Sequence, residues 1–199
     1  MTGDAAASEG RRSRPVVYVD RDGTLNPDFH YLADPDRIEL LPGVSQGIGE
    51  LRAGGFAVVC VTNQSGVARG LYTRGTVELI HARIQARLAR AGTEIDRFYY
   101  CPHAPADGCD CRKPKLALFL QAERELGLGR SGSGIIGDRW LDISVGAQLG
   151  LRKVLVPERG VEAETLAEFQ PDRPAPDYVA SDFLDAARYL LLRRREIPA

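Results

Sequence analysis

The sequence predicts an α/β fold in which helices cover both faces of a parallel β-sheet. Short runs rich in Val, Ile and aromatic residues alternate along the chain with longer segments of helical periodicity. The short runs are continuously apolar, which is typical of strands that are covered on both faces. With 199 residues, 44% of them hydrophobic, the chain is long enough for one core of ordinary size. We therefore expect a single domain at 15–199.

The elements follow one another in the order that a parallel sheet requires. The predicted strands cover 16–20, 57–63, 97–101, 134–138 and 153–156, with a shorter sixth at 177–180. The predicted helices cover 43–55, 76–92, 115–127, 141–150 and 181–193. Ser181 is expected to be the N-cap of the last helix. His81, in a helix rich in Arg and Gln, is expected to face solvent.

Three segments lie outside this pattern. Residues 1–14 are small and polar, and we expect a poorly ordered tail there. Residues 157–177 include four prolines and are interpreted as a surface excursion. Cys60 lies inside an apolar run and is expected to pack as a small buried hydrophobe.

Net charge excludes some classes of partner. The 26 basic and 27 acidic side chains nearly cancel, which disfavours a nucleic-acid or membrane surface and favours a small-molecule partner. No apolar run approaches the roughly 20 residues of a membrane span, and the N-terminus lacks the apolar core of a secretion signal. We expect a cytoplasmic protein, working as a monomer.

Two acidic side chains directly follow the first predicted strand. Asp20 and Asp22 are two residues apart, so both can face one pocket. A Mg²⁺ ion would relieve their repulsion and also bind phosphate oxygens. One carboxylate could then attack phosphorus while its neighbour transfers a proton. Taken alone, such a motif is more often an ordinary turn.

Other predicted strands also end in polar residues, and ligands of open parallel sheets bind at this edge. The second strand ends in donors suited to phosphate oxygens, Thr62, Asn63, Gln64 and Ser65. Lys113 would neutralise a transferring phosphoryl group, and Asp138 would complete the cation site. Asp142, one helical turn later, would orient Lys113 or cap the helix. Because these residues follow successive strands in this order, a catalytic site is a better interpretation than a set of unrelated turns.

A cysteine-rich loop at 101–111 predicts a structural zinc site. Its spacing, C-x-H-x₅-C-x-C, offers three thiolates and one imidazole from Cys101, His103, Cys109 and Cys111. The loop has too few apolar residues to form a core of its own, so a metal would replace one. Arg112 and Lys113 come directly after the last ligand, and the loop would therefore fix where they point. Free thiols that happen to lie together are the alternative.

These motifs together resemble the haloacid dehalogenase superfamily of aspartate-nucleophile phosphatases. The segments DRDGTLN (20–26), Thr62, Lys113 and GDRWLD (137–142) resemble its four motifs. The resemblance implies that Asp20 is the nucleophile and that Asp22 is the acid and base. It also implies Mg²⁺ bound by the carboxylates of Asp20 and Asp138 and by the backbone carbonyl of Asp22. The implied fold is a three-layer Rossmann-like sheet with minimal or no cap.

Two families within the superfamily are similar to this chain, the heptose bisphosphate phosphatases and the histidinol-phosphate phosphatases. The resemblance rests on TNQSGVARG (62–70) and CPHAPADGCDCRKP (101–114). It implies substrate contacts from Asp28, Phe29, His30, Tyr31, Asn63, Gln64, Ser65, Arg69, Arg112 and Arg139. His30 is equally compatible with an ordinary surface histidine.

The choice of substrate depends on opposing details. NQSGVARG favours removal of the 7-phosphate of D-glycero-D-manno-heptose 1,7-bisphosphate, whose second phosphate Arg69 or Arg112 could bind. The short spacing between zinc ligands and the run RKPK favour histidinol phosphate or another small sugar phosphate. A zinc-dependent binding module without catalysis is the remaining alternative, but it gives the three aspartates no role.

Overall fold

The computed structural model describes residues 13–157, 162–167, 169 and 172–194. Within these residues six strands form one parallel sheet in the order β3-β2-β1-β4-β5-β6. The strands are β1 (Arg14–Val19), β2 (Ala57–Asn63), β3 (Arg97–Cys101), β4 (Leu128–Gly137), β5 (Arg152–Leu155) and β6 (Tyr178–Val179). The α-helices are α1 (Val44–Ala53), α2 (Arg74–Arg90), α3 (Ala117–Leu126), α4 (Trp140–Leu149), α5 (Glu162–Ala167) and α6 (Phe183–Arg194). Two short 3₁₀ helices are η1 (Pro35–Arg37) and η2 (Pro105–Asp107).

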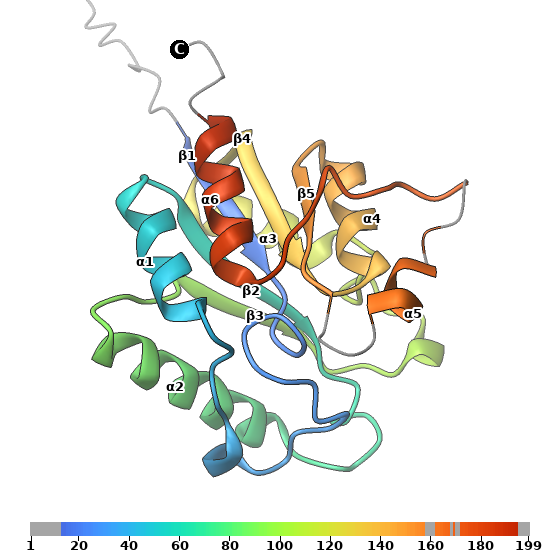
Figure 1. Ribbon diagram of the computed structural model, residues 1–199. Coiled ribbons are helices and arrows are strands. Elements are labelled where there is room, and N and C mark those ends of the chain that lie inside the picture. Colours follow the sequence, from blue (N-terminus) through green and yellow to red (C-terminus); the bar gives the residue numbers. More distant parts are fainter. Residues whose placement is uncertain (1–12, 158–161, 168, 170–171, 195–199) are drawn as a thin grey trace, which may run out of the picture.

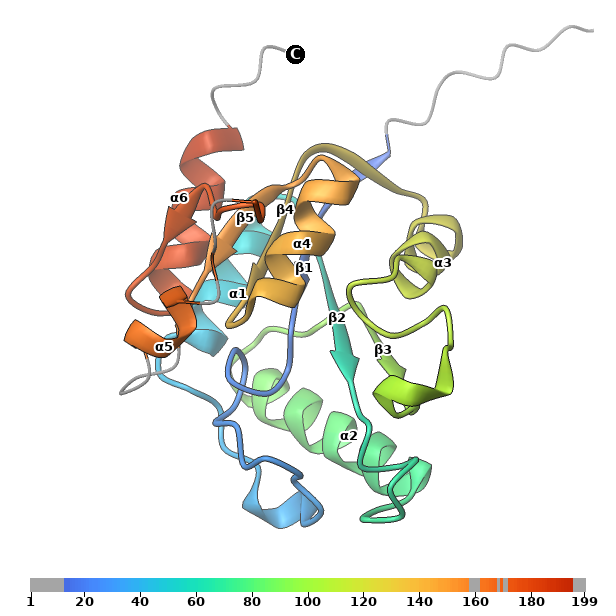
Figure 2. The ribbon, with the colours of Figure 1, turned by 90° about the vertical axis from the view of Figure 1, so that its right-hand side faces the viewer.

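The helices form a layer on each face of the sheet, as expected for a Rossmann-like fold. Helices α1, α2 and α6 pack on one face, and α3 and α4 pack on the other (Figures 1 and 2). Along β1, Val17 and Val19 contact the first layer, whereas Val16 and Tyr18 contact the second. The Tyr18 ring meets Phe119 of α3 edge-on at 5.0 Å. Burial on both faces explains why the strands are continuously apolar.

The central position of β1 determines where a ligand can bind. From β1 the chain runs outward through β2 to β3, and then returns to place β4 on the other side of β1. The connections after β1 and β4 therefore diverge, which creates a crevice at the carboxyl ends of these two strands. Asp20 follows β1, and Asp138 follows β4. Two predicted cation ligands thus lie at the switch point of the sheet.

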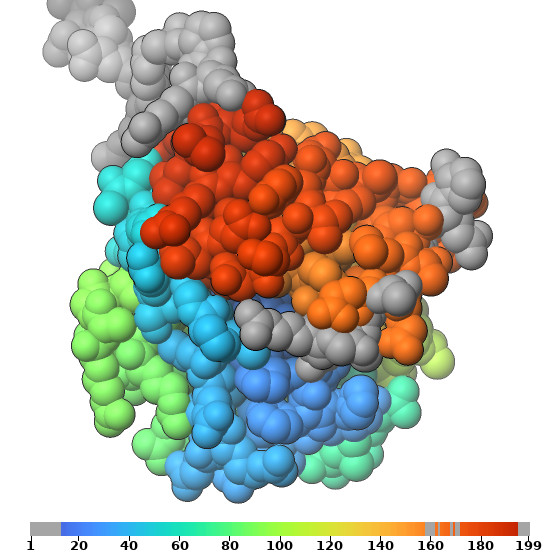
Figure 3. Space-filling view, in the orientation of Figure 1, coloured from blue at the N-terminus to red at the C-terminus, as the bar shows by residue number. Residues whose placement is uncertain are grey.

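The connections after β1 and β2 come together at the surface. The segment after β1, blue in Figure 3, lies beside the teal segment that follows β2. Arg69 in the second connection stacks on the Tyr31 ring of the first, 5.8 Å from its centroid. Both connections therefore border the same edge of the sheet.

Three local predictions differ from the structure. Arg14, assigned to the tail, begins β1, and its guanidinium contacts Asp96 at 2.8 Å. The α6 N-terminus is capped by Asp182, whose Oδ1 accepts from Asp185 N at 2.8 Å, and not by Ser181. The prediction that His81 faces solvent is wrong, because its ring stacks on Phe98 at 4.6 Å and is 7% exposed.

The remaining predictions concern the ends of the chain and one connection. The tail prediction otherwise falls on residues 1–12, which lie outside the described residues. In the 157–177 segment the structure adds the short helix α5, while 158–161, 168, 170 and 171 are not described. Cys60 is fully buried, as predicted. No helix within the described residues combines the length and the apolar character needed to cross a membrane.

Candidate active site

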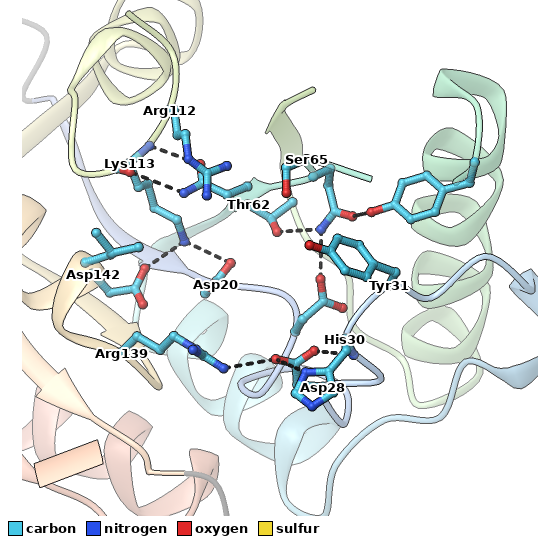
Figure 4. A pocket seen from close by; sticks show the side chains of 15 residues that line it. Asp20, Asp28, His30, Tyr31, Thr62, Ser65, Arg112, Lys113, Arg139 and Asp142 are labelled. Carbon is cyan, nitrogen blue, oxygen red and sulfur yellow. Dashed lines mark hydrogen bonds and ion pairs between the residues drawn. The ribbon is translucent and has the colours of Figure 1, made fainter. Parts of the chain in front are cut away.

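A pocket of about 350 Å³ opens at the carboxyl edge of the sheet (Figure 4). Most of its lining residues are polar, and they come from the end of β2, from the connections after β1, β2, β3 and β4, and from the start of α4. The lining residues are Asp20, Asp22, Asp28, His30, Tyr31, Thr62, Asn63, Gln64, Ser65, Tyr72, Arg112, Lys113, Arg139, Leu141 and Asp142. Most of the predicted strand-end residues therefore converge on one cavity, although Asp138 is not among the described residues that line it.

A buried lysine lies between two carboxylates in this pocket. Lys113 Nζ is 2.9 Å from Asp20 Oδ1 and 2.7 Å from Asp142 Oδ1 (Figure 4). Burial lowers the pKa of Lys113, but the charges of Asp142 and Asp20 outweigh burial and raise the pKa overall. The ammonium group is therefore charged at neutral pH and points at the oxygen of the predicted nucleophile.

Three carboxylates next to this lysine form a candidate cation site. Oxygens of Asp20, Asp138 and Asp142 lie within 4.8 Å of one another. Burial raises the pKa of Asp138 well above its usual value, and the charges of Asp20 and Asp142 raise it further. Asp138 Oδ1 is buried and has no hydrogen-bond partner among the described residues. Such an orphaned oxygen beside other carboxylates fits a hard divalent cation.

Glycine lets the first connection pass close to this site. Gly23 has φ +80°, and a Cβ there would collide with the Asp138 carboxylate.

Burial raises the pKa of Asp142 to about 6, although the charge of Lys113 opposes that rise. Asp142 Oδ1 accepts from Lys113 Nζ at 2.7 Å and orients the lysine, while its buried Oδ2 has no hydrogen-bond partner among the described residues.

The second aspartate of the first motif is not a member of this cluster, and its carboxylate bonds to other protein groups. Asp22 Oδ1 accepts from Arg21 Nε at 3.1 Å and from Asn26 Nδ2 at 3.0 Å. Asp22 Oδ2 accepts from Arg21 Nη2 at 2.9 Å and from Gln64 Nε2 at 2.8 Å. Burial alone would raise the pKa of Asp22, but the charge and hydrogen bonds of Arg21 outweigh it and lower the pKa. Only the backbone of Asp22 is thus left for a cation.

Asn63 ties the second connection to the lysine. Lys113 N donates to Asn63 Oδ1 at 3.0 Å, and Asn63 Nδ2 donates to Lys113 O at 3.3 Å. Both ends of this amide are used, so Asn63 fixes the backbone of Lys113. Thr62 Oγ1 lines the pocket and accepts from Gln64 Nε2 at 2.9 Å.

An ion pair joins the loop after β1 to the start of α4. Arg139 Nη2 lies 3.1 Å from Asp28 Oδ2, and Arg139 Nε lies 3.4 Å from Asp138 Oδ2. The other Asp28 oxygen accepts from His30 N at 2.7 Å. His30 has φ 59°, a left-handed conformation that this Asx-type turn stabilises. Asp28 therefore shapes the loop that carries His30 and Tyr31 to the pocket.

The cysteine-rich loop gathers its four predicted ligands. Atoms of Cys101, His103, Cys109 and Cys111 lie within 4.8 Å of one another, and Cys111 Sγ is 3.1 Å from His103 Nδ1. Three sulfurs and one imidazole nitrogen at such distances are compatible with tetrahedral zinc. Arg112 Nη1 donates to His103 O at 3.3 Å, so the loop also restrains a pocket guanidinium.

Comparison with known proteins supplies the family. A family model described as HAD-hydrolase-like matches residues 110–186. A D-glycero-β-D-manno-heptose-1,7-bisphosphate 7-phosphatase from Yersinia pestis is 33% identical, covering 92% of this chain and 98% of that protein. The chain belongs to the HAD-like phosphatase family. A phosphatase of the same name from Photorhabdus laumondii is 39% identical over 77% of this chain and 86% of its own.

Solved structures of this phosphatase family agree with the fold. The crystal structure of D,D-heptose 1,7-bisphosphate phosphatase from B. bronchiseptica, complexed with magnesium and phosphate, has a TM-score of 0.80 and 35% identity. The match covers 90% of this chain and 99% of that chain. A HAD-like phosphatase from Mesorhizobium loti follows with a TM-score of 0.76 and 28% identity over 92% of this chain and 87% of its own.

Not all of the predicted substrate contacts of this HAD-like phosphatase reach the pocket. Phe29 and Arg69 are not among the described residues that line it: Phe29 packs under Arg37 at 4.9 Å, and Arg69 lies on Tyr31. The side chains of Asn63 and Gln64 line the pocket but bond to protein groups. Ser65, Arg112, Arg139 and the loop residues Asp28, His30 and Tyr31 remain at the cavity.

Sequence reasoning missed two side chains of this phosphatase that organise the site. Arg21 is fully buried although it stands between two pocket aspartates, and Tyr72 donates to Gln64 Oε1 at 2.8 Å. Arg21 offered no usable signal, because its bidentate contact with Asp22 depends on the turn that the chain makes inside the first motif. Tyr72 lies in a connection without periodicity and offered no signal either.

Proposed function

We propose that this chain is a Mg²⁺-dependent phosphatase that removes the 7-phosphate of D-glycero-D-manno-heptose 1,7-bisphosphate through an aspartyl-phosphate at Asp20. The observation that carries the proposal is the position of Asp20, whose oxygen meets Lys113 Nζ beside the Asp138 carboxylate. Relatives of the same name that align over most of this chain support the substrate.

The chemistry assigns one role to each acidic side chain. An Asp20 oxygen forms a bond to phosphorus while the bond from phosphorus to the sugar oxygen breaks. The sugar oxygen takes a proton from the Asp22 carboxyl group as it leaves. Water then attacks the phosphoryl group, Asp22 takes its proton, and the bond to Asp20 breaks to release phosphate. The charge of an arriving phosphate opposes the effect of Arg21 on Asp22 and favours the protonated form that the first step needs.

The positive groups stabilise the transferring phosphoryl. Lys113 Nζ neutralises charge next to Asp20, and Thr62 and Ser65 supply hydroxyl donors from the adjoining connection. When bound by Asp20, Asp138 and the backbone of Asp22, Mg²⁺ supplies further positive charge. Arg112 and Arg139 stand at the cavity as partners for the second phosphate.

Zinc has a structural role in this proposal. Cys101, His103, Cys109 and Cys111 would hold it in a closed site that has no position for a reacting water. The bond from Arg112 to the carbonyl of His103 links that site to the pocket. We also propose that the protein acts as a cytoplasmic monomer. Its near-zero net charge disfavours a nucleic-acid partner and favours a free metabolite.

A comparison of substrates tests the proposal. The value of kcat/KM for heptose 1,7-bisphosphate and for histidinol phosphate would be measured on one preparation with Mg²⁺, because specificity is the ratio of these values. We expect the heptose bisphosphate value to exceed the other by at least about 100-fold. A ratio near one, or a preference for histidinol phosphate, would refute the assigned substrate. Phosphate release from neither compound, and from no member of a panel of other small sugar phosphates, would refute the enzyme class.

A further inference from the structure

The carboxylate of Asp22 is held by an unusually complete set of donors. Both of its oxygens are occupied, since Arg21 bonds to both of them while Asn26 and Gln64 each bond to one. A bidentate guanidinium fixes the plane of a carboxylate as well as its position. The Asp22 side chain is nevertheless 24% exposed and lines the pocket. One face of a rigidly held carboxylate is therefore presented to the ligand.

Burial of the Arg21 guanidinium costs free energy of desolvation, so its position needs an explanation. Its residue is fully buried, and Nη1 has no hydrogen-bond partner among the described residues. Removing a guanidinium from water is expensive, and a buried ion pair often stabilises a fold no better than apolar residues of similar volume. Fold stability alone thus gives a weak account of a buried arginine at this position.

Gln64 supports the same carboxylate from the neighbouring connection. Its Oε1 accepts from Arg21 Nη2 at 2.8 Å, and its Nε2 donates to Asp22 at 2.8 Å, so it bonds to both members of the ion pair. Its backbone N donates to Cys101 O at 2.7 Å, and Tyr72 OH donates to its Oε1. Gln64 is 2% exposed. The amide is therefore fixed from several sides and cannot follow a mobile carboxylate.

We propose that Arg21 and Gln64 are positioning residues that hold the Asp22 carboxylate where it exchanges a proton with the sugar oxygen and with water. This inference rests on the proposed function and assigns work to two residues whose side-chain hydrogen bonds, among the described residues, all go to protein groups. Asp20, Lys113 and Asp138 do not contact the side chain of Arg21 through any hydrogen bond or ion pair between described residues. Bond formation to phosphorus should therefore be separable from proton transfer.

Substrates with different leaving groups separate bond formation to phosphorus from proton transfer. A sugar alkoxide must be protonated as it departs, whereas 2,4-dinitrophenolate is stable without a proton. Loss of Asp22 alignment should slow phosphoryl transfer from the sugar phosphate and leave transfer from dinitrophenyl phosphate nearly intact. Hydrolysis of the aspartyl-phosphate, which uses Asp22 as a base, should be slow with both compounds.

Rapid mixing of Arg21→Met with each substrate tests the proposal. With 2,4-dinitrophenyl phosphate we expect a dinitrophenolate burst within about 3-fold of the wild-type rate, followed by a slow steady state. With heptose 1,7-bisphosphate we expect kcat to fall on the order of 100-fold with little change in KM, the usual scale for general acid and base catalysis. Gln64→Leu should show the same pattern with a smaller loss, and it serves if Arg21→Met does not fold.

Two controls complete the design. Arg52→Met removes another arginine that bonds to two acidic groups, Asp96 and Glu94, far from the pocket, and both substrates should react at wild-type rates. Equal losses of burst rate and kcat in Arg21→Met, or wild-type values of both, would overturn the positioning role. Asp20→Asn separates the two hypotheses, because activity in that variant would overturn the phosphatase mechanism itself whatever Arg21→Met does.

Discussion

Lys113 Nζ lies 2.9 Å from Asp20 Oδ1, and both groups lie at the carboxyl edge of the sheet on different connections. The lysine is 3% exposed and is held from its backbone by Asn63 and from its ammonium group by Asp142. A fixed positive charge at this position accommodates the negative charge of a phosphate. The proposed nucleophile therefore lies next to a fixed positive charge that can bind an anion.

Lys113→Met should abolish most of the activity. Without the ammonium group, Asp20 and Asp142 repel the incoming phosphate, and kcat/KM should fall by at least about 100-fold. Steady-state kinetics with Mg²⁺ checks this. Lys153→Met, which removes an ion pair to Asp177 at 2.8 Å on β5, is the matched control and should retain wild-type kinetics. Activity within a few fold of wild type in Lys113→Met would contradict the role of the lysine.

Asp28→Ala should affect binding more than catalysis. The Asp28 carboxylate joins the loop to Arg139 and bonds to His30 N, so its loss frees the loop without touching Asp20. We expect KM to rise about 10-fold, the scale of one lost charge-assisted interaction, with kcat within about 3-fold. Asp36→Ala, which removes an exposed ion pair to Arg83 from the same connection, should change neither. An unchanged KM with a lower kcat would show that Asp28 acts on the chemical step.

Removal of zinc should destabilise the protein and leave the cation site able to bind Mg²⁺. Cys109→Ala or a zinc chelator should cost about 3 kcal/mol, because the loop has no core of its own. For a chain of this length, that loss lowers Tm by roughly 6–12 °C. Thermal melts and metal analysis check it, with Asp110→Ala as an exposed neighbour that should melt like wild type. Identical melts with and without chelator would contradict a structural zinc.

His81 should make stability depend on pH. Burial lowers the pKa of His81 to about 3, so the folded state keeps it neutral while the unfolded chain takes up a proton below about pH 6.5. Stability from this group is complete above pH 6.5 and is lost as pH falls, by about 2 kcal/mol at pH 5.

Denaturant unfolding of wild type and His81→Leu at pH 7 and pH 5 measures the contribution of His81 to the pH dependence of stability. Only the difference between the two proteins is informative, because acidic groups with raised pKa values act in the opposite direction. The variant should lose about 2 kcal/mol less than wild type over this interval. Parallel losses in both proteins would mean that His81 can take up a proton in the folded state.

The sequence predicted the sheet and its reactive edge because both depend on local sequence patterns. Apolar runs mark buried strands, and residues after parallel strands must meet at one edge. His81 was missed because the composition of its helix was weighed above its spacing, which places it four residues after Val77 on the buried face.

The orientation of Asp22 could not be read from the sequence for a different reason. The spacing of two residues places Asp20 and Asp22 on one side of an extended chain, but the chain turns at this point. The Asp22 side chain is therefore oriented by its hydrogen-bond donors, which are Arg21, Asn26 and Gln64. Arg21 and Asn26 belong to the same turn as Asp22, whereas Gln64 lies in the connection after β2, and no local pattern encodes that long-range contact.

Trapping of the phosphoryl group on Asp20 tests the central claim most directly. The enzyme would be mixed with Mg²⁺ and heptose 1,7-bisphosphate, quenched in acid within one turnover, digested and examined by mass spectrometry. We predict one added phosphoryl group on the peptide that contains Asp20, and neither adduct nor phosphate release in Asp20→Asn. An active Asp20→Asn enzyme, or an adduct on another residue, would contradict the account.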